Sequence, residues 1–163
     1  PIKDHDTLLK SLVKLKNWKV NFKCVLAGSG LNNKNIKLIQ KISMHKLENE
    51  IILFGKCLDV YNLLNSFDLN ILSSKSESFP LILIEAMSCG IPCISTNVGE
   101  AKQIIGNTGW IVEAENPEDL ANCIYRIHTK KNLLKDKSNL ARKRAQKLYK
   151  LEEMNRKYSS LYS

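Results

Sequence analysis

The sequence predicts an α/β fold, a doubly wound Rossmann-like domain with helices on both faces of a parallel sheet. Two observations support this prediction. Short apolar runs typical of fully buried strands recur along the chain, and segments with helical periodicity separate them throughout. In such folds, ligands bind where the carboxyl ends of the strands meet. Functional residues are therefore expected directly after the predicted strands.

The first half of the chain begins with a helix and then alternates. Apolar residues between positions 7 and 15 recur at helical spacing and predict the opening helix. An apolar run predicts a buried strand over 22–27, and Gly28-Ser29-Gly30 then forms a tight turn into a helix over 31–42. This glycine pair lacks the third glycine of a dinucleotide fingerprint, because position 33 is Asn. A strand over 51–54, a helix over 58–67 and a strand over 69–73 follow.

The second half centres on the run P-L-I-L-I-E-A-M from Pro80 to Met87, which predicts a helix that is apolar all round. Pro80 suits the first helical position, and Ser78 can accept hydrogen bonds from the free amides of the first turn. Gly90 supplies a left-handed cap, and Pro92 prevents continuation. The remaining elements are strands over 93–96 and 110–112, helices over 102–105 and 117–128, and terminal helices over 132–150 and 151–162.

Glu85 is the only charged residue inside this apolar helix. Because the helix leaves no solvent face, we expect it to be packed on every side and Glu85 to be buried. An unpartnered carboxylate removed from water costs several kcal/mol, so Glu85 needs a hydrogen-bond partner. Two partners remain open: an internal ion pair, for example with Lys102, or a ligand.

Glu77 lies on the loop before the same helix, whose free N-terminal amides favour an anion such as phosphate. Glu85 lies about 8 Å further along the helix axis than a first-turn residue, at 1.5 Å per residue. One ligand can therefore span both carboxylates, with phosphates on the helix start and hydroxyls at Glu77 and Glu85. The alternative for Glu77 is a solvated loop carboxylate.

The stretch E-S-F-P-L-I-L-I-E-A-M-S-C-G-I-P-C-I-S-T-N-V-G-E resembles the E-x7-E signature of retaining, nucleotide-sugar-dependent glycosyltransferases of the GT-B type, family 4. The flanking pieces V-L-A-G-S-G, I-I-L-F-G-K, S-F-D-L-N-I-L-S-S and N-T-G-W-I-V follow the family's order and spacing. The resemblance covers nearly the whole chain. The E-x7-E with its A-M-x-C-G-x-P continuation is specific, whereas the flanking pieces alone would be weak.

The resemblance implies a role for each matching residue. Glu85 would accept hydrogen bonds from the ribose hydroxyls of a UDP- or GDP-hexose donor. Glu77 would be the catalytic residue: it would face the transferred sugar and hold its hydroxyls close to the anomeric carbon. Lys3 would neutralise the departing diphosphate. No metal or other cofactor is required. The other expected donor-binding residues are Ser78, Phe79, Pro80, Leu81 and Ile82 around the diphosphate, Gly55, Lys56 and Cys57 at the base, and Gly28 and Gly30 bordering the cleft.

Length limits this expectation, because 163 residues form one domain and a GT-B enzyme needs two. The family normally has an initial strand and an arginine before the lysine, and the chain starts at Pro1 without either. The loop after Val98 also reads G-E where many members read G-G. We therefore expect the C-terminal, donor-binding domain alone, which would bind donor and transfer little without an N-terminal acceptor domain.

Composition bears on partners and location. Lys and Arg number 25 against 16 Asp and Glu, a net charge of +9 concentrated between residues 130 and 150. Either this region is a solvated face, or it contacts anionic lipid at the inner face of a membrane. The chain lacks a nucleic-acid-binding signature. The five cysteines are an odd number at spacings that suggest no pairing, which fits a reducing cytoplasm. The three histidines are scattered, so a zinc site is not expected. The sequence shows no signal peptide and no transmembrane segment.

Two other function classes stay open. The chain could be a non-catalytic nucleotide-sugar sensor or assembly subunit that has the pocket without the catalytic partner domain. It could also be a sugar-nucleotide epimerase of similar architecture, which would need an acid and base pair that the sequence does not offer. His5, next to Lys3, is expected at the surface of the first helical turn, with a pocket role as the alternative.

Overall fold

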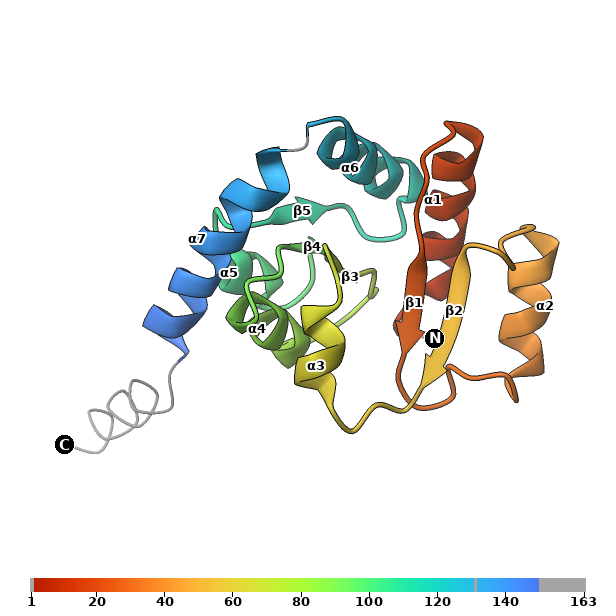
Figure 1. The fold of residues 1–163 in the computed structure, drawn as a ribbon, viewed down its shortest axis with the longest axis horizontal. Helices are drawn as coiled ribbons and strands as arrows, with labels where there is room; N and C mark the ends of the chain where they lie inside the picture. The colour runs from red at the N-terminus through yellow and green to blue at the C-terminus, as the bar shows by residue number, and fades with distance from the viewer. Residues whose placement is uncertain (1, 131, 150–163) are drawn as a thin grey trace.

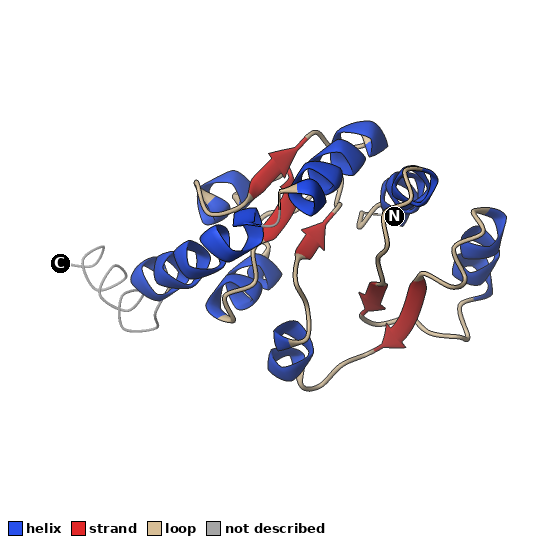
Figure 2. Ribbon diagram, turned by 45° about the horizontal axis from the view of Figure 1, so that its top comes forward, coloured by secondary structure: helices blue, strands red, loops and turns tan. Residues whose placement is uncertain are grey.

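The computed structural model describes residues 2–130 and 132–149, and within them every strand pairing is parallel. Strand β1 (Cys24–Ala27) pairs with β2 (Ile51–Gly55), and β4 (Cys93–Thr96) lies between β3 (Asn70–Leu72) and β5 (Trp110–Val112). The predicted parallel α/β architecture is confirmed. The sheet is parted, however, because no ladder of hydrogen bonds joins β1 to β3 in the described chain (Figure 2).

The helices follow the predicted order (Figure 1). The prediction of a last helix over 151–162 lies outside the described residues. The seven helices of the described part are α1 (His5–Asn17), α2 (Ile36–Met44), α3 (Val60–Asn65), α4 (Leu81–Ser88), α5 (Ala101–Ile105), α6 (Pro117–Thr129) and α7 (Asn132–Leu148).

Two apolar cores lie on opposite sides of the three-stranded sheet. Neighbouring residues of β4 belong to different cores: Ile94 to the core that includes buried residues of α1, α2 and α6, and Cys93 to the core that includes buried residues of α3, α4, α5 and α7. Since successive strand residues face opposite sides, this alternation shows that helices cover both faces of the sheet. The domain is therefore doubly wound, as its apolar strands indicate.

Three helices begin later than predicted, and each has a local reason. Helix α2 begins at Ile36 because the Asn35 side chain accepts from the Leu38 amide. Helix α3 begins at Val60 because Asp59 caps it in the same way. Helix α4 begins at Leu81, since Pro80 has an extended conformation (ψ 91°) and stands before the first turn.

The predicted all-round packing of α4 is wrong. Leu83, Ala86 and Met87 are buried, but Leu81, Glu85 and Ser88 are exposed. Positions 81, 85 and 88 share one face of a helix, so they form a continuous exposed stripe. Helices α5 and α7 and the sheet pack around the rest of α4, and its exposed stripe faces a hollow beside α3. Because Leu81 is apolar although exposed, the sequence of α4 shows no polar side that would indicate a solvent-facing surface.

Candidate functional site

The candidate site lies where the chain leaves the carboxyl ends of the parallel strands. The segment after β3 leads through Ser74 and Glu77 to the start of α4, and the segment after β4 carries Val98, Gly99 and Glu100. The start of the chain lies against the first of these segments: Lys75 N–H donates to the Ile2 carbonyl (2.8 Å). This is the edge at which α/β folds bind ligands.

Lys3 and Glu77, which are 74 residues apart in the sequence, form an ion pair at this edge. The Lys3 Nζ lies 2.6 Å from Glu77 Oε1, and the Ser74 hydroxyl donates to the same oxygen (2.8 Å). Ser74 is fully buried, and its carbonyl accepts from Thr96 Oγ1 (2.6 Å), which ties the loop to β4. The two residues predicted from separate motifs therefore share one site.

The start of α1 fixes the backbone of Lys3. Asp4 is buried and left-handed (φ 44°), and its carboxylate accepts from the Thr7 amide and hydroxyl as the N-cap of α1. The Ser73 hydroxyl donates to the Lys3 carbonyl (3.1 Å). His5, the first residue of α1, is half-buried, and burial lowers its pKa. The predicted surface position of His5 is therefore only partly correct.

Glu77 is a held carboxylate rather than a solvated one. Its side chain is 17% exposed. Partial burial opposes its ionisation, but the hydrogen bonds from Lys3 and Ser74 and the Lys3 charge outweigh burial, so the pKa of Glu77 lies below its ordinary value. Glu77 is therefore ionised at neutral pH and fixed in one position.

Gly99 allows the second loop to approach the first. Its φ is 46°, and a Cβ at this position would lie 2.1 Å from the Glu77 carbonyl oxygen and 2.4 Å from that of Ser78. The Glu100 N–H donates to the Ser78 carbonyl (3.0 Å). No residue with a side chain fits there without displacing the backbone of the Glu77 loop. The G-E sequence of this loop thus keeps the one glycine that the contact needs.

The first turn of α4 presents open amides. In residues 2–130 and 132–149, no acceptor is found for the backbone N–H groups of Phe79, Leu81 and Ile82. The predicted Ser78 cap is wrong, because no side chain caps α4 and Pro80 itself is the N-cap residue. Without a capping side chain, the amides of Leu81 and Ile82 remain available to an anion, as do those of other helix starts that bind phosphate.

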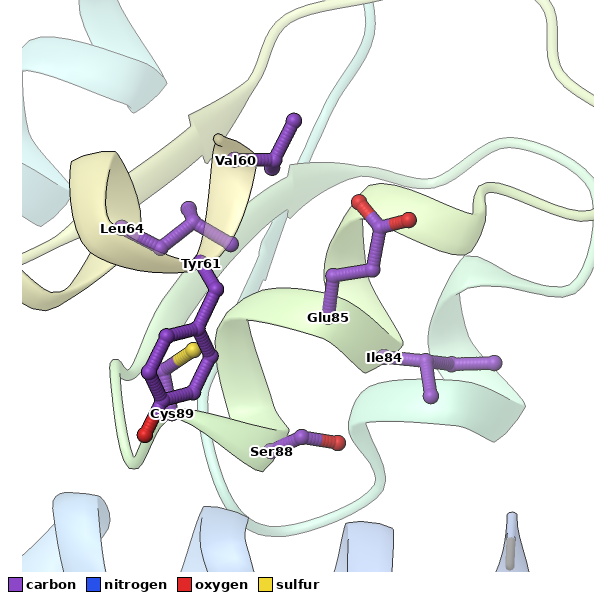
Figure 3. A pocket seen from close by; sticks show the side chains of 7 residues that line it. All are labelled: Val60, Tyr61, Leu64, Ile84, Glu85, Ser88 and Cys89. Atoms are coloured by element: carbon purple, nitrogen blue, oxygen red, sulfur yellow. The ribbon is translucent and has the colours of Figure 1, made fainter. Parts of the chain in front are cut away.

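Glu85 is exposed, so its predicted burial is wrong. It forms no ion pair with Lys102 or with any other described residue. Instead it lies at a hollow of about 340 Å³ between α3 and α4 (Figure 3). In that view its carboxylate points away from Ser88 and Cys89 and toward the side of Val60. The other lining residues are Tyr61, Leu64 and Ile84.

The predicted glycines gather at the ends of β1 and β2. The Gly28 N–H donates to the Gly55 carbonyl (2.7 Å), and Gly28, Gly30 and Gly55 all have positive φ. Lys56 is exposed and Cys57 half-buried on the loop that leads to α3. In the part of the chain that the structure describes, no hydrogen bond or ion pair joins these five residues to Lys3, Glu77 or Glu85.

The sequence analysis did not single out Ser74, and it named the G-E loop after Val98 without predicting the contact of Gly99 with the Glu77 loop. Ser74 comes directly after a predicted strand, and polar residues at that position in α/β folds commonly contact ligands. Its position could therefore have indicated a site residue. The contact of Gly99 with Glu77 joins two loops that are distant in the sequence. A local sequence pattern cannot predict such a contact.

The cysteines form no disulfide in the structure. All five are free thiols, and burial raises the pKa of Cys24 and of Cys93 to about 12. Among the described residues, no three His, Cys, Asp or Glu side chains are grouped closely enough to hold a metal ion. Nor does any helix of that part have the length and apolar character needed to cross a membrane.

Comparison with known proteins gives one consistent family. The pattern of the family "Glycosyl transferases group 1" matches residues 1–144. The chain is 30% identical over 146 residues to the N-acetyl-alpha-D-glucosaminyl L-malate synthase of Bacillus anthracis, covering 88% of this chain and 38% of that protein. The chain therefore spans well under half the length of this relative.

Solved structures agree. A glycosyltransferase from Rickettsia africae superposes with a TM-score of 0.89 at 31% identity, covering 99% of this chain and 44% of the other. The Anabaena protein HepE, solved in complex with UDP, has the same fold at 22% identity, with a TM-score of 0.88 over 99% of this chain and 45% of its own.

Proposed function

The chain belongs to the glycosyl transferases group 1 family, and on that premise we propose that it is the C-terminal, donor-binding half of a retaining family 4 enzyme of the E-x7-E type. The observation that carries the proposal is the grouping at the start of α4. Within residues 77–85 follow Glu77, which pairs with Lys3, the open amides of the first turn of α4, and Glu85, which has no side-chain partner among the described residues and borders a hollow. This grouping suits a ligand with a sugar, a diphosphate and a ribose.

Glu85 binds the nucleoside end of this ligand. Its carboxylate has no partner among the described side chains, and Glu85 lines the hollow between α3 and α4. Two neighbouring ribose hydroxyls are donors of the right kind, and hydrogen bonds to a carboxylate are stronger than neutral ones. Exposure in the absence of ligand removes the need for an internal partner, since water solvates the charge.

Lys3 and the helix start bind the diphosphate. The Lys3 side chain is 59% exposed, so its ammonium can contact a phosphate without leaving the vicinity of Glu77. The amides of Phe79, Leu81 and Ile82 supply further donors at the positive end of the helix dipole. Charge on the leaving diphosphate is thus neutralised by protein groups, and we propose that no metal ion is required.

Glu77 holds the transferred hexose. Fixed by Lys3 and Ser74, its carboxylate accepts from the sugar hydroxyls and keeps the anomeric carbon near the diphosphate. In the reaction we propose, an acceptor hydroxyl attacks the anomeric carbon from the face that the diphosphate leaves. The bond from that carbon to the diphosphate oxygen breaks, and the diphosphate takes the hydroxyl proton. Attack and departure on one face retain the configuration.

The acceptor side belongs to a second domain. Since the chain spans 38% to 45% of the compared proteins, the acceptor site and part of the cleft are assigned to an N-terminal domain. Acceptors are saccharides or lipids, and the product belongs to glycan or surface polysaccharide synthesis in the cytoplasm. Alone, these 163 residues bind donor and transfer little.

The proposal also includes a peripheral membrane contact through α7. Several basic residues of α7 are exposed, among them Arg142, Lys143 and Lys147, and each basic residue near an anionic bilayer contributes about 1 kcal/mol. Changing these three to Gln should reduce sedimentation with vesicles that contain phosphatidylglycerol. Equal sedimentation of the variant and the parent would remove the membrane contact from the proposal.

A thermal-shift panel tests the proposed function. UDP-, GDP- and ADP-hexoses are added to the chain, and the cognate donor at about 100 times its dissociation constant should stabilise the fold by about 2.7 kcal/mol. Glu85→Ala serves as the control, because it removes the nucleoside contact at an exposed position. If no nucleotide sugar raises the melting temperature of the parent, the donor-binding proposal fails.

A further inference from the structure

Helix α7 turns one basic face toward α5. Lys137 and Arg144 are seven residues apart and therefore lie on the same side of the helix. The Arg144 guanidinium donates to the Ile104 carbonyl through Nε (2.8 Å) and to the Gln103 carbonyl through Nη2 (2.6 Å). The Lys137 Nζ donates to the Asn107 carbonyl (2.5 Å). Two of the basic residues predicted to form a solvated or lipid-facing surface thus bind backbone carbonyls of the domain instead.

The two Arg144 bonds lie at the carboxyl end of α5. The last carbonyls of a helix lack backbone partners and lie at the negative end of its dipole, so a cation there is doubly favourable. Gly106 makes the approach possible, because a Cβ at this position would lie 2.6 Å from Arg144 Cζ. A helix of five residues is too short to be stable by itself, so α5 depends on such external contacts.

The other end of α5 meets the candidate site. Helix α5 follows directly on Gly99 and Glu100, and these two residues contact the backbone of Glu77 and Ser78. Ala101, Ile104 and Ile105 of α5 are fully buried, so the helix has little freedom to shift between its two ends. Helix α5 therefore links α7 mechanically to the loop that carries Glu77.

We propose that Arg144 is a positioning residue for Glu77. By holding the carboxyl end of α5, it keeps Gly99 and Glu100 pressed on the Glu77 loop and thereby fixes the carboxylate that faces the donor sugar. Lys137, about two turns earlier on α7, donates to the Asn107 carbonyl just beyond the same end of α5. The consequence for donor binding rests on the proposed function, but the mechanical link does not depend on any ligand.

Amide hydrogen exchange tests the link in the ligand-free chain. In Arg144→Ala, the Glu100 amide, which donates to the Ser78 carbonyl, should exchange about tenfold faster or more, while amides of β4 keep their rates. Lys143→Ala is the matched control, because this neighbour on the same helix is exposed and its replacement should leave the exchange rates of the Glu100 and β4 amides unchanged. Arg144→Lys, which retains a cation, should restore part of the protection.

Two results of this experiment would overturn the proposal. One is an unchanged Glu100 amide in a folded Arg144→Ala protein. The other is a uniform acceleration that includes β4, which would reduce Arg144 to a general stabilising residue. If Arg144→Ala does not fold, Arg144→Lys tests the proposal instead. The lysine side chain is shorter and has one nitrogen, so the Glu100 amide should still exchange faster than in the parent while the β4 amides keep their rates. An unchanged Glu100 rate, or an equal acceleration of the β4 amides, contradicts the link.

Calorimetry then separates this inference from the proposed function. Arg144→Ala should lose more affinity for UDP-glucose, or for the donor that the panel selects, than for the bare nucleotide, because only the sugar end meets Glu77. Equal losses for both would contradict the positioning role. If the parent chain binds neither compound, the proposed function fails, and the exchange experiment still decides whether Arg144 controls the Glu77 loop.

Discussion

The two carboxylates of the site stand in opposite surroundings. Glu77 is mostly enclosed and is held by an ammonium, a hydroxyl and a loop pressed on its backbone. Glu85 is exposed, has no partner among the described side chains, and borders a hollow. The sequence pattern predicts a buried Glu85, and for Glu77 it leaves a solvated loop carboxylate open as the alternative to a sugar contact.

This contrast separates a preformed subsite from one that a ligand completes. A carboxylate already fixed by neighbours costs little ordering when the sugar arrives, whereas an exposed one must exchange water for ligand hydroxyls. We infer that the sugar end of the site is built in advance and that the nucleoside end forms upon binding. The following predictions test each side of the contrast.

The largest effect is expected at Gly99. Gly99→Ala places a Cβ 2.1 Å from the Glu77 carbonyl oxygen at a left-handed position, so we expect a loss of about 2 to 5 kcal/mol in the free energy of unfolding. Urea denaturation measures it. Gly30→Ala is the matched control: its φ is 77°, but no atom lies within 4 Å of the added Cβ, and strain alone costs about 1 to 2 kcal/mol. Equal losses would mean that the two loops do not depend on their contact.

A smaller effect is expected from Glu77→Gln, which keeps the shape of the side chain and removes its charge. Affinity for the complete sugar nucleotide should fall by roughly tenfold, as a charged hydrogen bond becomes a neutral one, and affinity for the bare nucleotide should change less. Calorimetric titration with both compounds measures the difference. Glu85→Gln is the opposite control and should affect both compounds alike. A common loss in Glu77→Gln would assign Glu77 to the nucleotide instead.

The smallest effect is expected in the pH dependence of stability. The pKa of Glu77 is lower in the folded protein than in the unfolded chain, so its ionised form stabilises the fold at a pH above the unfolded pKa. That stabilisation is lost as the pH falls through the folded pKa. The free-energy difference between the parent and Glu77→Gln should therefore be constant above about pH 5 and shrink below it. A difference that grows in acid would contradict the Lys3 ion pair.

The fold could be predicted further than the site. Apolar strands and helical spacing locate every strand and helix of the described chain, because each depends on a local pattern. The exposure of Glu85 could not be predicted, because Leu81 lies on the same exposed side of α4 and its apolar side chain makes that side look buried in the sequence. The contact of Gly99 with Glu77 joins residues 22 positions apart, and the bonds of Arg144 to Ile104 and Gln103 join residues 40 and 41 positions apart. Only tertiary packing decides such contacts.

The central claim is that Glu85 accepts hydrogen bonds from the ribose of a nucleotide, and a double-mutant cycle with deoxyribose tests it most directly. Calorimetry of UDP and 2′-deoxy-UDP, or of the corresponding guanine pair, is carried out on the parent and on Glu85→Ala. The parent should prefer the ribonucleotide by about 1.5 to 3 kcal/mol per charged hydrogen bond, and Glu85→Ala should lose most of that preference while keeping its melting temperature. The same preference in both proteins would contradict the assignment of Glu85.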